Sequence, residues 1–214
     1  MYPDGFSVAE RDGTALFKCH AGGCTQSDII ASLQEKGLWA SKGDAPKDHP
    51  TTVTAHSLAA QKLWERSRPA PGTLVETYLR SRQYSGPIPP VLKFLANAKH
   101  TESGLSLPIM VAAATSHHDQ CVNAIHRTYL APDGTGKANV TPAKKSLGQI
   151  GRGAVWLSPP AKIMCVAEGI ETALSCLQAT GIACAAALST GGLRKLLLPP
   201  LPLASEVIIA ADND

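Results

Sequence analysis

Residues 163–169 have the sequence IMCVAEG, and residues 207–214 have the sequence VIIAADND. Each stretch is a short apolar run that ends on acidic residues, and such runs are typical of buried strands in a parallel sheet. Ligands of open α/β sheets bind at the carboxyl ends of the strands. We therefore expect Glu168, Asp212 and Asp214 to lie at one edge of a sheet.

Three carboxylates at one sheet edge repel one another unless a cation lies between them. Oxygen ligands of this kind favour Mg²⁺ or Mn²⁺, usually shared with the phosphates of a substrate. One acidic residue at a strand end more often caps the next helix, but an acid after each of two strands favours a metal site. The pattern predicts a phosphoryl-transfer site in which Glu168, Asp212 and Asp214 are catalytic and bind the metal. Whether Glu168 is a ligand or a general acid or base stays open.

The surrounding residues alternate between strand and helix patterns. Strands are expected at 163–167, 183–188 and 206–211, with a helix over 172–180 and a shorter helix after residue 190. Glu171 is interpreted as a partner of the helix dipole. The turn Ser189-Thr190-Gly191-Gly192 either presents backbone amides to a phosphate or is a plain strand-to-helix turn.

The rest of the chain predicts an α/β protein whose N-terminal part is α+β. Residues 1–38 are expected to form a short β-ribbon and a helix, and residues 39–54 have the composition of a linker. Residues 55–160 are expected to be a mixed α+β region, and residues 161–214 a parallel sheet with flanking helices.

Within these segments the sequence gives more local signals. Thr25 with Asp28, and Thr73 with Glu76, are expected to form capping boxes. Further expected elements are a helix over 55–67 and strands at 107–114, 121–130 and 151–157.

Composition and charge narrow the class of protein. Hydrophobic residues make up 44% and charged residues 17% of the chain, and the net charge is only +3, which indicates a globular protein. Residues 134–167 contain several basic residues and no acidic one. That stretch is either a solvated basic face or a phosphate-binding track. Candidates for contacts with nucleotide or nucleic-acid phosphates are Arg127, Lys144, Lys145 and Arg152.

Targeting and redox signals are absent from the sequence. The six cysteines show no regular disulfide framework, and no apolar run approaches the length that crosses a bilayer. We expect a cytoplasmic protein without a membrane partner.

Three motifs in order resemble the Toprim domain: VAEGIETALS at 166–175, LSTGGL at 188–193 and VIIAADND at 207–214. The resemblance is strongest to DNA primases of phages and plasmids. The sequence IHRTYL at 125–130, with the lysines at 144–145, is similar to the region that precedes Toprim in those primases. The resemblance covers most of residues 70–214, and it makes residues 55–160 a primase-associated region. It implies that Glu168, Asp212 and Asp214 surround catalytic Mg²⁺.

The implied function is a nucleotidyltransferase that synthesises RNA primers from ribonucleoside triphosphates on a single-stranded DNA template during replication. A replicative helicase is a candidate partner. Two alternatives stay open: a Toprim nuclease, and a non-catalytic fragment of a primase that binds DNA or the replisome. Toprim domains extend beyond the Asp-x-Asp motif, so we expect an incomplete domain whose chain is inactive alone.

Cys19 and Cys24 resemble the second half of the zinc ribbon, or zinc finger, of the same primases. A tetrahedral Zn²⁺ site needs two more ligands, and the upstream pair that the family uses is missing here. Residues 1–38 are therefore expected to be a partial zinc-ribbon-like segment. Zn²⁺ is a candidate cofactor of this incomplete site, and the alternative is a remnant with two thiols.

Overall fold

The computed structural model describes residues 6–11, 14–19, 23–36, 54–117 and 121–211. It divides the chain into two compact units, Met1–Thr52 and Val53–Asp214. The finer boundaries expected from the sequence stay predictions.

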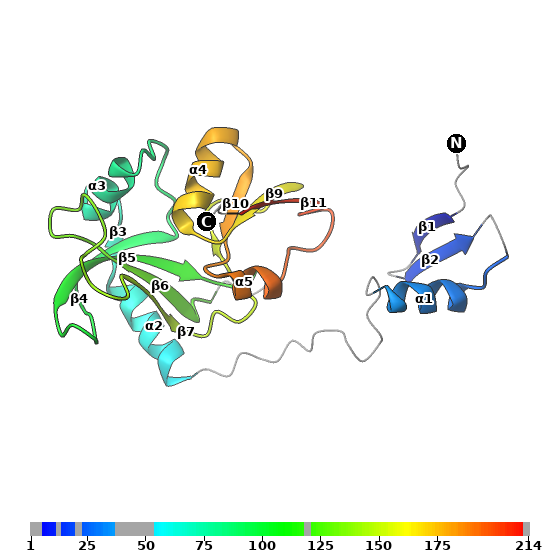
Figure 1. Cartoon of the computed structure of the whole chain (residues 1–214), viewed down its shortest axis with the longest axis horizontal. Coiled ribbons are helices and arrows are strands. Elements are labelled where there is room, and N and C mark those ends of the chain that lie inside the picture. Colours follow the sequence, from blue (N-terminus) through cyan, green and yellow to red (C-terminus); the bar gives the residue numbers. More distant parts are fainter. Residues whose placement is uncertain (1–5, 12–13, 20–22, 37–53, 118–120, 212–214) are drawn as a thin grey trace. The chain divides into compact units, whose positions relative to one another are not determined.

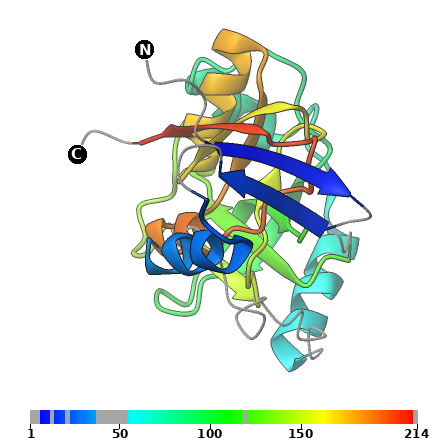
Figure 2. The same ribbon diagram turned by 90° about the vertical axis from the view of Figure 1, so that its right-hand side faces the viewer.

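The first unit contains an antiparallel ribbon and one helix (Figures 1 and 2). Strands β1 (Phe6–Arg11) and β2 (Thr14–Cys19) pair along their whole length. Helix α1 (Gln26–Glu35) begins with the predicted capping box: Asp28 N donates to Thr25 Oγ1 at 3.3 Å, and Thr25 N donates to Asp28 Oδ2 at 2.9 Å. Two backbone N–H groups that the helix leaves unpaired at its start are thereby satisfied.

The second unit contains two sheets, and the larger is antiparallel with the order β3-β4-β5-β6-β7 (Figure 1). The predicted strands at 107–114 and 121–130 are found as β5 and β6, whereas β4 and β7 were not predicted. The bounds are β3 (Arg68–Pro69), β4 (Leu92–Lys99), β5 (Ser106–Ala114), β6 (Ala124–Tyr129) and β7 (Lys144–Gly148).

The two faces of this sheet pack against different helices. Along β5, Ile109 and Val111 pack on the side of α2 (Ala55–Arg66), while Met110 and Ala112 pack on the side of α3 (Leu74–Ser81). All four side chains are buried, as the two-residue period of a strand between two apolar layers requires. The helix expected over 55–67 is thereby confirmed.

Helix α3 begins differently from the prediction. Thr73 caps it by accepting a hydrogen bond from Val75 N at 3.2 Å. The carboxylate of Glu76 reaches back to Gly72 N at 2.8 Å, one residue before the expected partner. The expected reciprocal capping box is therefore not formed, because the N–H of Thr73 already donates to Ala70 O.

The smaller sheet has the order β11-β9-β10-β8. Its three strands β9, β10 and β11 are parallel, as predicted, and β8 adds an antiparallel edge that pairs with β10. Helices α4 and α5 follow β9 and β10, so the predicted alternation of strand and helix is confirmed. The bounds are β8 (Val155–Trp156), β9 (Ile163–Ala167), α4 (Ile170–Thr180), β10 (Ala183–Ala186), α5 (Thr190–Lys195) and β11 (Glu206–Ala210).

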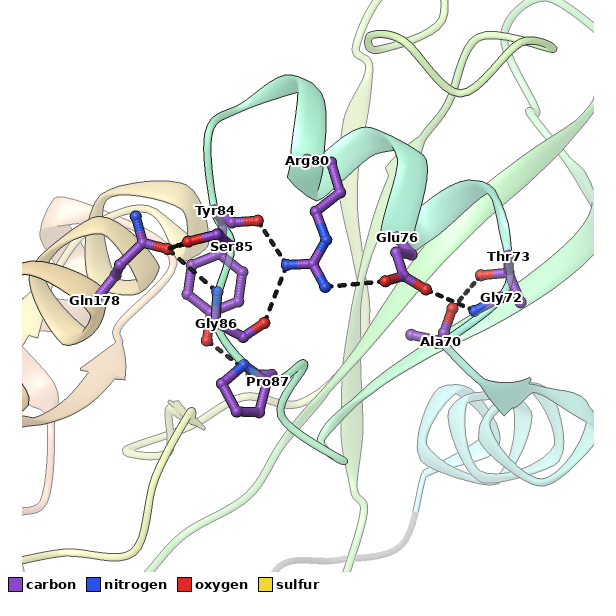
Figure 3. A network of polar contacts seen from close by, with 10 residues as sticks. All are labelled: Ala70, Gly72, Thr73, Glu76, Arg80, Tyr84, Ser85, Gly86, Pro87 and Gln178. Atoms are coloured by element: carbon purple, nitrogen blue, oxygen red, sulfur yellow. Dashed lines mark hydrogen bonds and ion pairs between the residues drawn. The ribbon is translucent and has the colours of Figure 1, made fainter.

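Helices α3 and α4 join the two sheets into one core. Buried side chains of both helices pack in a single apolar cluster with Met110 of the larger sheet and Cys165 of the smaller one. A polar contact closes the surface of this junction: Gln178 of α4 accepts hydrogen bonds from Ser85 N at 2.6 Å and Gly86 N at 3.2 Å (Figure 3). The loop after α3 is thus held against α4, which fixes the larger sheet relative to the end of β9.

Candidate active site

Glu168 is the first residue after β9, and the turn between β10 and α5 holds it in place. Leu188 N donates to the backbone oxygen of Glu168 at 2.9 Å, and Thr190 Oγ1 donates to its carboxylate Oε2 at 3.0 Å. The side chain is half-buried. Two of the predicted Toprim motifs therefore meet at this carboxylate, one through Glu168 and the other through Thr190.

A pocket of about 390 Å³ opens beside Glu168. It has two walls that come from different sheets. The carboxylate wall, at the end of β9, consists of Glu168, Gly169, Ile170 and Leu188. The basic wall, on β6 and β7, consists of His126, Lys144, Lys145 and Ser146.

Strand pairing builds the basic wall. In the antiparallel pair of β6 and β7, His126 lies opposite Ser146 and Thr128 lies opposite Lys144. Directly opposite residues project from the same face of a sheet, so His126, Ser146 and Lys144 share one face. His126 Nδ1 and Ser146 Oγ are 3.1 Å apart, which fixes the plane of the imidazole ring.

Lys144 is held by a buried carboxylate. Its Nζ lies 2.8 Å from Glu171 Oε2, and Tyr78 OH donates to Glu171 Oε1 at 2.6 Å. Burial alone would raise the pKa of Glu171, but the Lys144 ammonium and the hydrogen bonds from Lys144 and Tyr78 lower it to about 2. Burial and the nearby Glu171 charge raise the pKa of Tyr78, so the phenol stays protonated. Glu171 is thus a permanent anion within the protein.

Lys145 and His126 complete the electrostatics of the basic wall. Lys145 Nζ pairs with Glu102 Oε1 at 2.5 Å, and this hydrogen bond lowers the pKa of Glu102. Burial and the charge of Lys144 lower the pKa of His126 to about 4. His126 is therefore neutral at pH 7. Lys144 shares its face of the sheet and supplies the positive charge of this wall, whereas Lys145 lies opposite Arg127, so its ammonium belongs to the other face.

Two predicted phosphate contacts lie outside the pocket lining. Arg127 is on the face of β6 opposite His126, and its guanidinium lies 3.4 Å from both Tyr129 OH and Ser146 O. Arg152 donates from Nε to Lys195 O at 3.3 Å, beside the end of α5. The structure brings Lys144 and Lys145 together with Glu168, but it does not bring either arginine there.

The other two predicted carboxylates, Asp212 and Asp214, lie outside the described residues. Strand β11 leads toward them, and its last residue, Ala210, pairs with Ala167, the last residue of β9. The two strands are parallel and end level with each other. Strand β11 therefore ends at the edge of the sheet where Glu168 lies.

The Glu168 carboxylate offers one oxygen of the kind that a hard divalent cation prefers. The carboxylate is half-buried, and Thr190 engages only Oε2, so Oε1 receives no hydrogen bond from the described part of the chain. Carboxylate oxygen is the ligand that Mg²⁺ prefers. Among the described residues there is no group of three or more His, Cys, Asp or Glu side chains able to hold a metal ion.

The cysteines of the first unit form a smaller cluster. A hydrogen bond with Cys19, followed by the charge of that thiol, raises the pKa of Cys24. Cys24 is exposed and Cys19 is half-buried. The structure therefore shows two adjacent thiols, and a zinc ribbon is not shown.

A larger hollow of about 600 Å³ lies between the start of α3 and strands β3 and β4. Its charged side chains Glu76 and Arg80 pair with each other at 2.9 Å (Figure 3). None of the predicted site residues lines it. We place the candidate site at the smaller pocket, where a strand-end carboxylate and Lys144 line one hollow.

Several residues of this site were not predicted from the sequence. His126 and Ser146 line the pocket, and Tyr78 and Glu171 hold Lys144 from behind. The two-residue alternation along β6 places His126 and Arg127 on opposite faces. Which of the two faces the pocket depends on the packing of the sheet, which a single sequence does not reveal.

Residues 163–214 match the family model of the Toprim domain, and residues 54–157 match the family described as domain of unknown function (DUF7146). No curated protein and no solved structure matches the chain. No helix in the described part of the chain is long and apolar enough to cross a membrane. The chain thus contains a Toprim domain, a domain found in enzymes such as primases and nucleases, and Toprim domains in general bind Mg²⁺.

Proposed function

We propose that the pocket is the active site of a Mg²⁺-dependent nucleotidyltransferase that synthesises RNA primers on single-stranded DNA. The observation that carries the proposal is the pairing of Glu168, from the Toprim domain, with Lys144 and Lys145, from the region before it, in one pocket of about 390 Å³. A nucleoside triphosphate needs both a divalent cation and basic side chains, because its phosphates carry several negative charges.

The basic wall binds the triphosphate. Lys144 supplies its ammonium group, which is held by Glu171, and Lys145 lines the pocket from the same strand while its ammonium pairs with Glu102 on the other face of the sheet. Gly169 is the N-cap residue of α4 and has no side chain to cap the helix, so the positive end of the helix dipole also lines the pocket. Anionic groups are stabilised at such a terminus by about 0.3–1 kcal/mol.

In this proposal the carboxylate wall binds the metal and accepts the proton of the attacking hydroxyl. Mg²⁺ bound by Glu168, with Asp212 and Asp214 as further ligands, would neutralise charge on the reacting phosphates. In primer synthesis the 3′-hydroxyl oxygen of one nucleotide bonds to the α-phosphorus of the next, and pyrophosphate leaves. Glu168, if it is not itself a ligand, accepts the proton of that hydroxyl.

The contacts with the template are a separate part of the proposal. Arg127 and Arg152 lie outside the pocket and are proposed to contact the phosphate backbone of single-stranded DNA. Such contacts position a strand without selecting its sequence. A replicative helicase as partner, and Zn²⁺ at Cys19 and Cys24, remain proposals from the resemblance to phage and plasmid primases.

Primer synthesis tests the proposal directly. The 214-residue chain and a version extended past Asp214 are incubated with labelled ribonucleoside triphosphates and single-stranded DNA, with and without Mg²⁺, each beside its variant Glu168→Gln. We expect labelled oligonucleotides only from a protein with Glu168 intact and only with Mg²⁺. Synthesis by the variant would exclude the role of Glu168, and Mg²⁺-dependent cleavage of the template without synthesis would identify a nuclease instead.

A further inference from the structure

Glu171 connects three elements of the second unit, and none of its hydrogen bonds within the described part of the chain involves the carboxylate of Glu168. It belongs to the first turn of α4, accepts a hydrogen bond from Tyr78 of α3 at 2.6 Å, and pairs with Lys144 of β7 at 2.8 Å. The Glu171 side chain is 14% exposed and that of Lys144 is 33% exposed, so the carboxylate of this ion pair is largely shielded from solvent. A shielded, hydrogen-bonded pair fixes side-chain geometry far better than an exposed pair does.

Positive charges gather around Lys144. Burial and the nearby charge of Lys144 lower the pKa of Lys137, whereas the charge of Glu171 raises it. Lys137 and Lys144 are thus like charges close together, and Glu171 is the carboxylate paired with Lys144. Without Glu171, repulsion from Lys137 would drive the Lys144 ammonium away from its place.

The two carboxylates at the start of α4 have different partners. Glu168 lines the pocket and is held by Thr190, whereas Glu171 is bound by Tyr78 and Lys144. Glu171 is not among the lining residues. This separation argues against Glu171 as a further ligand of the same metal.

We propose that Glu171, itself oriented by Tyr78, is a positioning residue that holds the Lys144 ammonium on the basic wall for a substrate phosphate. It acts through Lys144 and makes no contact with the nucleotide. The pair also links the Toprim domain to the region before it, because Glu171 lies on one and both of its partners lie on the other. For its catalytic consequence this inference rests on the proposed function.

A double-mutant cycle tests the claim that Glu171 acts through Lys144. Kinetics of primer synthesis are measured for the wild type, Glu171→Gln, Lys144→Gln and the double variant. Loss of a charged hydrogen bond predicts a fall of about tenfold in kcat/KM for Glu171→Gln, carried mainly by a higher KM for the nucleotide. In the Lys144→Gln background the same change should cost less than about twofold.

Two further variants are measured beside the cycle: one is a control, and the other makes a smaller change to the same contact. Glu76→Gln also removes a paired carboxylate, on α3 and outside the pocket, and should leave KM unchanged. Tyr78→Phe removes only the hydroxyl and should raise KM by about two- to fivefold, since one neutral hydrogen bond to Glu171 is lost. Equal losses from Glu171→Gln in both backgrounds would overturn the proposal, because Glu171 would then act independently of Lys144.

A second measurement does not depend on enzymatic activity. Lysine acylation by an activated ester, followed site by site by mass spectrometry, reports how firmly Lys144 is held, with the exposed Lys162 as internal reference. Acylation of Lys144 should be several-fold faster in Glu171→Gln and in Tyr78→Phe than in the wild type, while thermal melting verifies that each variant is folded. Unchanged acylation rates in folded variants would overturn the positioning role. Absence of primer synthesis by the wild type would instead remove the proposed function and leave the acylation result to decide this inference.

Discussion

The two walls of the pocket are built in different ways. The carboxylate wall comes from three consecutive residues at the end of β9, completed by Leu188, so local chain geometry defines it. The basic wall comes from two antiparallel strands, and each of its lysines is paired with a carboxylate distant in sequence, Glu171 or Glu102. The two walls therefore differ in what they can bind: the carboxylate wall offers oxygen to a cation, and the basic wall offers positive charge to phosphates. Each prediction below changes one wall and leaves the other intact.

Neutralising the carboxylate wall should have the largest effect. Glu168→Gln keeps an oxygen that can accept from Thr190 but removes the charge, so metal-dependent synthesis should fall on the order of 10³-fold or more, as expected for lost metal catalysis. Thermal unfolding should be unchanged. Glu206→Gln, at an exposed carboxylate that begins β11, is the control and should retain full activity. Equal losses in both variants would point to an effect of net charge instead of the site.

Neutralising Lys144 of the basic wall should have the second-largest effect. Lys144→Gln removes the ammonium group that shares a sheet face with His126 and Ser146, so the KM for nucleotide should rise about 10- to 100-fold, the cost of a charged hydrogen bond to phosphate. Lys62→Gln, at an exposed lysine of α2 outside the pocket lining, should change KM by less than about twofold. A similar KM for wild type and Lys144→Gln would remove the basic wall from substrate binding.

Alanine substitutions at two glycines near the carboxylate wall distinguish an effect on protein stability from an effect on nucleotide binding. A Cβ at Gly192 would lie 2.0 Å from Ala187 O, whereas a Cβ at Gly169 would meet its nearest neighbour, Thr172 Oγ1, at 3.5 Å. Gly192→Ala should therefore lower the free energy of unfolding by about 1–3 kcal/mol, and Gly169→Ala should leave it unchanged. Urea denaturation measures both.

Gly169 lines the pocket, so its methyl variant should weaken nucleotide binding several-fold without loss of stability. Destabilisation by Gly169→Ala to the same extent as by Gly192→Ala would mean that the fold, and not access to the pocket, requires that glycine.

The pH dependence of the free energy of unfolding tests whether His126, a residue of the basic wall, is neutral in the folded protein. The pKa of His126 is lowered from 6.5 to about 4 in the folded protein, so the unfolded chain binds the extra proton first as the pH falls. The free energy of unfolding should therefore decrease between about pH 6.5 and pH 4, by on the order of 3 kcal/mol. Denaturation of the wild type and of His126→Gln over pH 4–7.5 measures the contribution of His126 to this pH dependence. An identical pH dependence of the two proteins would show that His126 does not carry it.

The sequence predicted the carboxylate wall far better than the basic wall. The runs 163–167 and 206–211 and the acid that follows each of them are contiguous, so strand and candidate ligand were found together. Strand β7, by contrast, has the sequence KKSLG and lies at the edge of its sheet. Two lysines and a glycine give it little intrinsic strand propensity, and its pairing with β6 alone makes it a strand.

Contacts between residues far apart in the chain could not be predicted either, because they too depend on how the elements pack. Glu171 was interpreted only as a partner of its own helix dipole, yet it pairs with residues 27 and 93 positions away. The turn 189–192 was left open between phosphate binding and a plain turn. In the structure Ser189 Oγ accepts from Gly192 N at 2.9 Å and caps α5, so that amide is used within the protein.

Nucleotide binding tests most directly whether the two walls form one site. The affinity for a labelled ribonucleoside triphosphate is measured at equilibrium, with and without Mg²⁺, for the wild type, Glu168→Gln and Lys144→Gln. The two-wall account predicts that Mg²⁺ strengthens binding to the wild type, that Glu168→Gln abolishes this gain, and that Lys144→Gln weakens binding with or without the metal. Binding that is indifferent to Mg²⁺ and equal in all three proteins would contradict it.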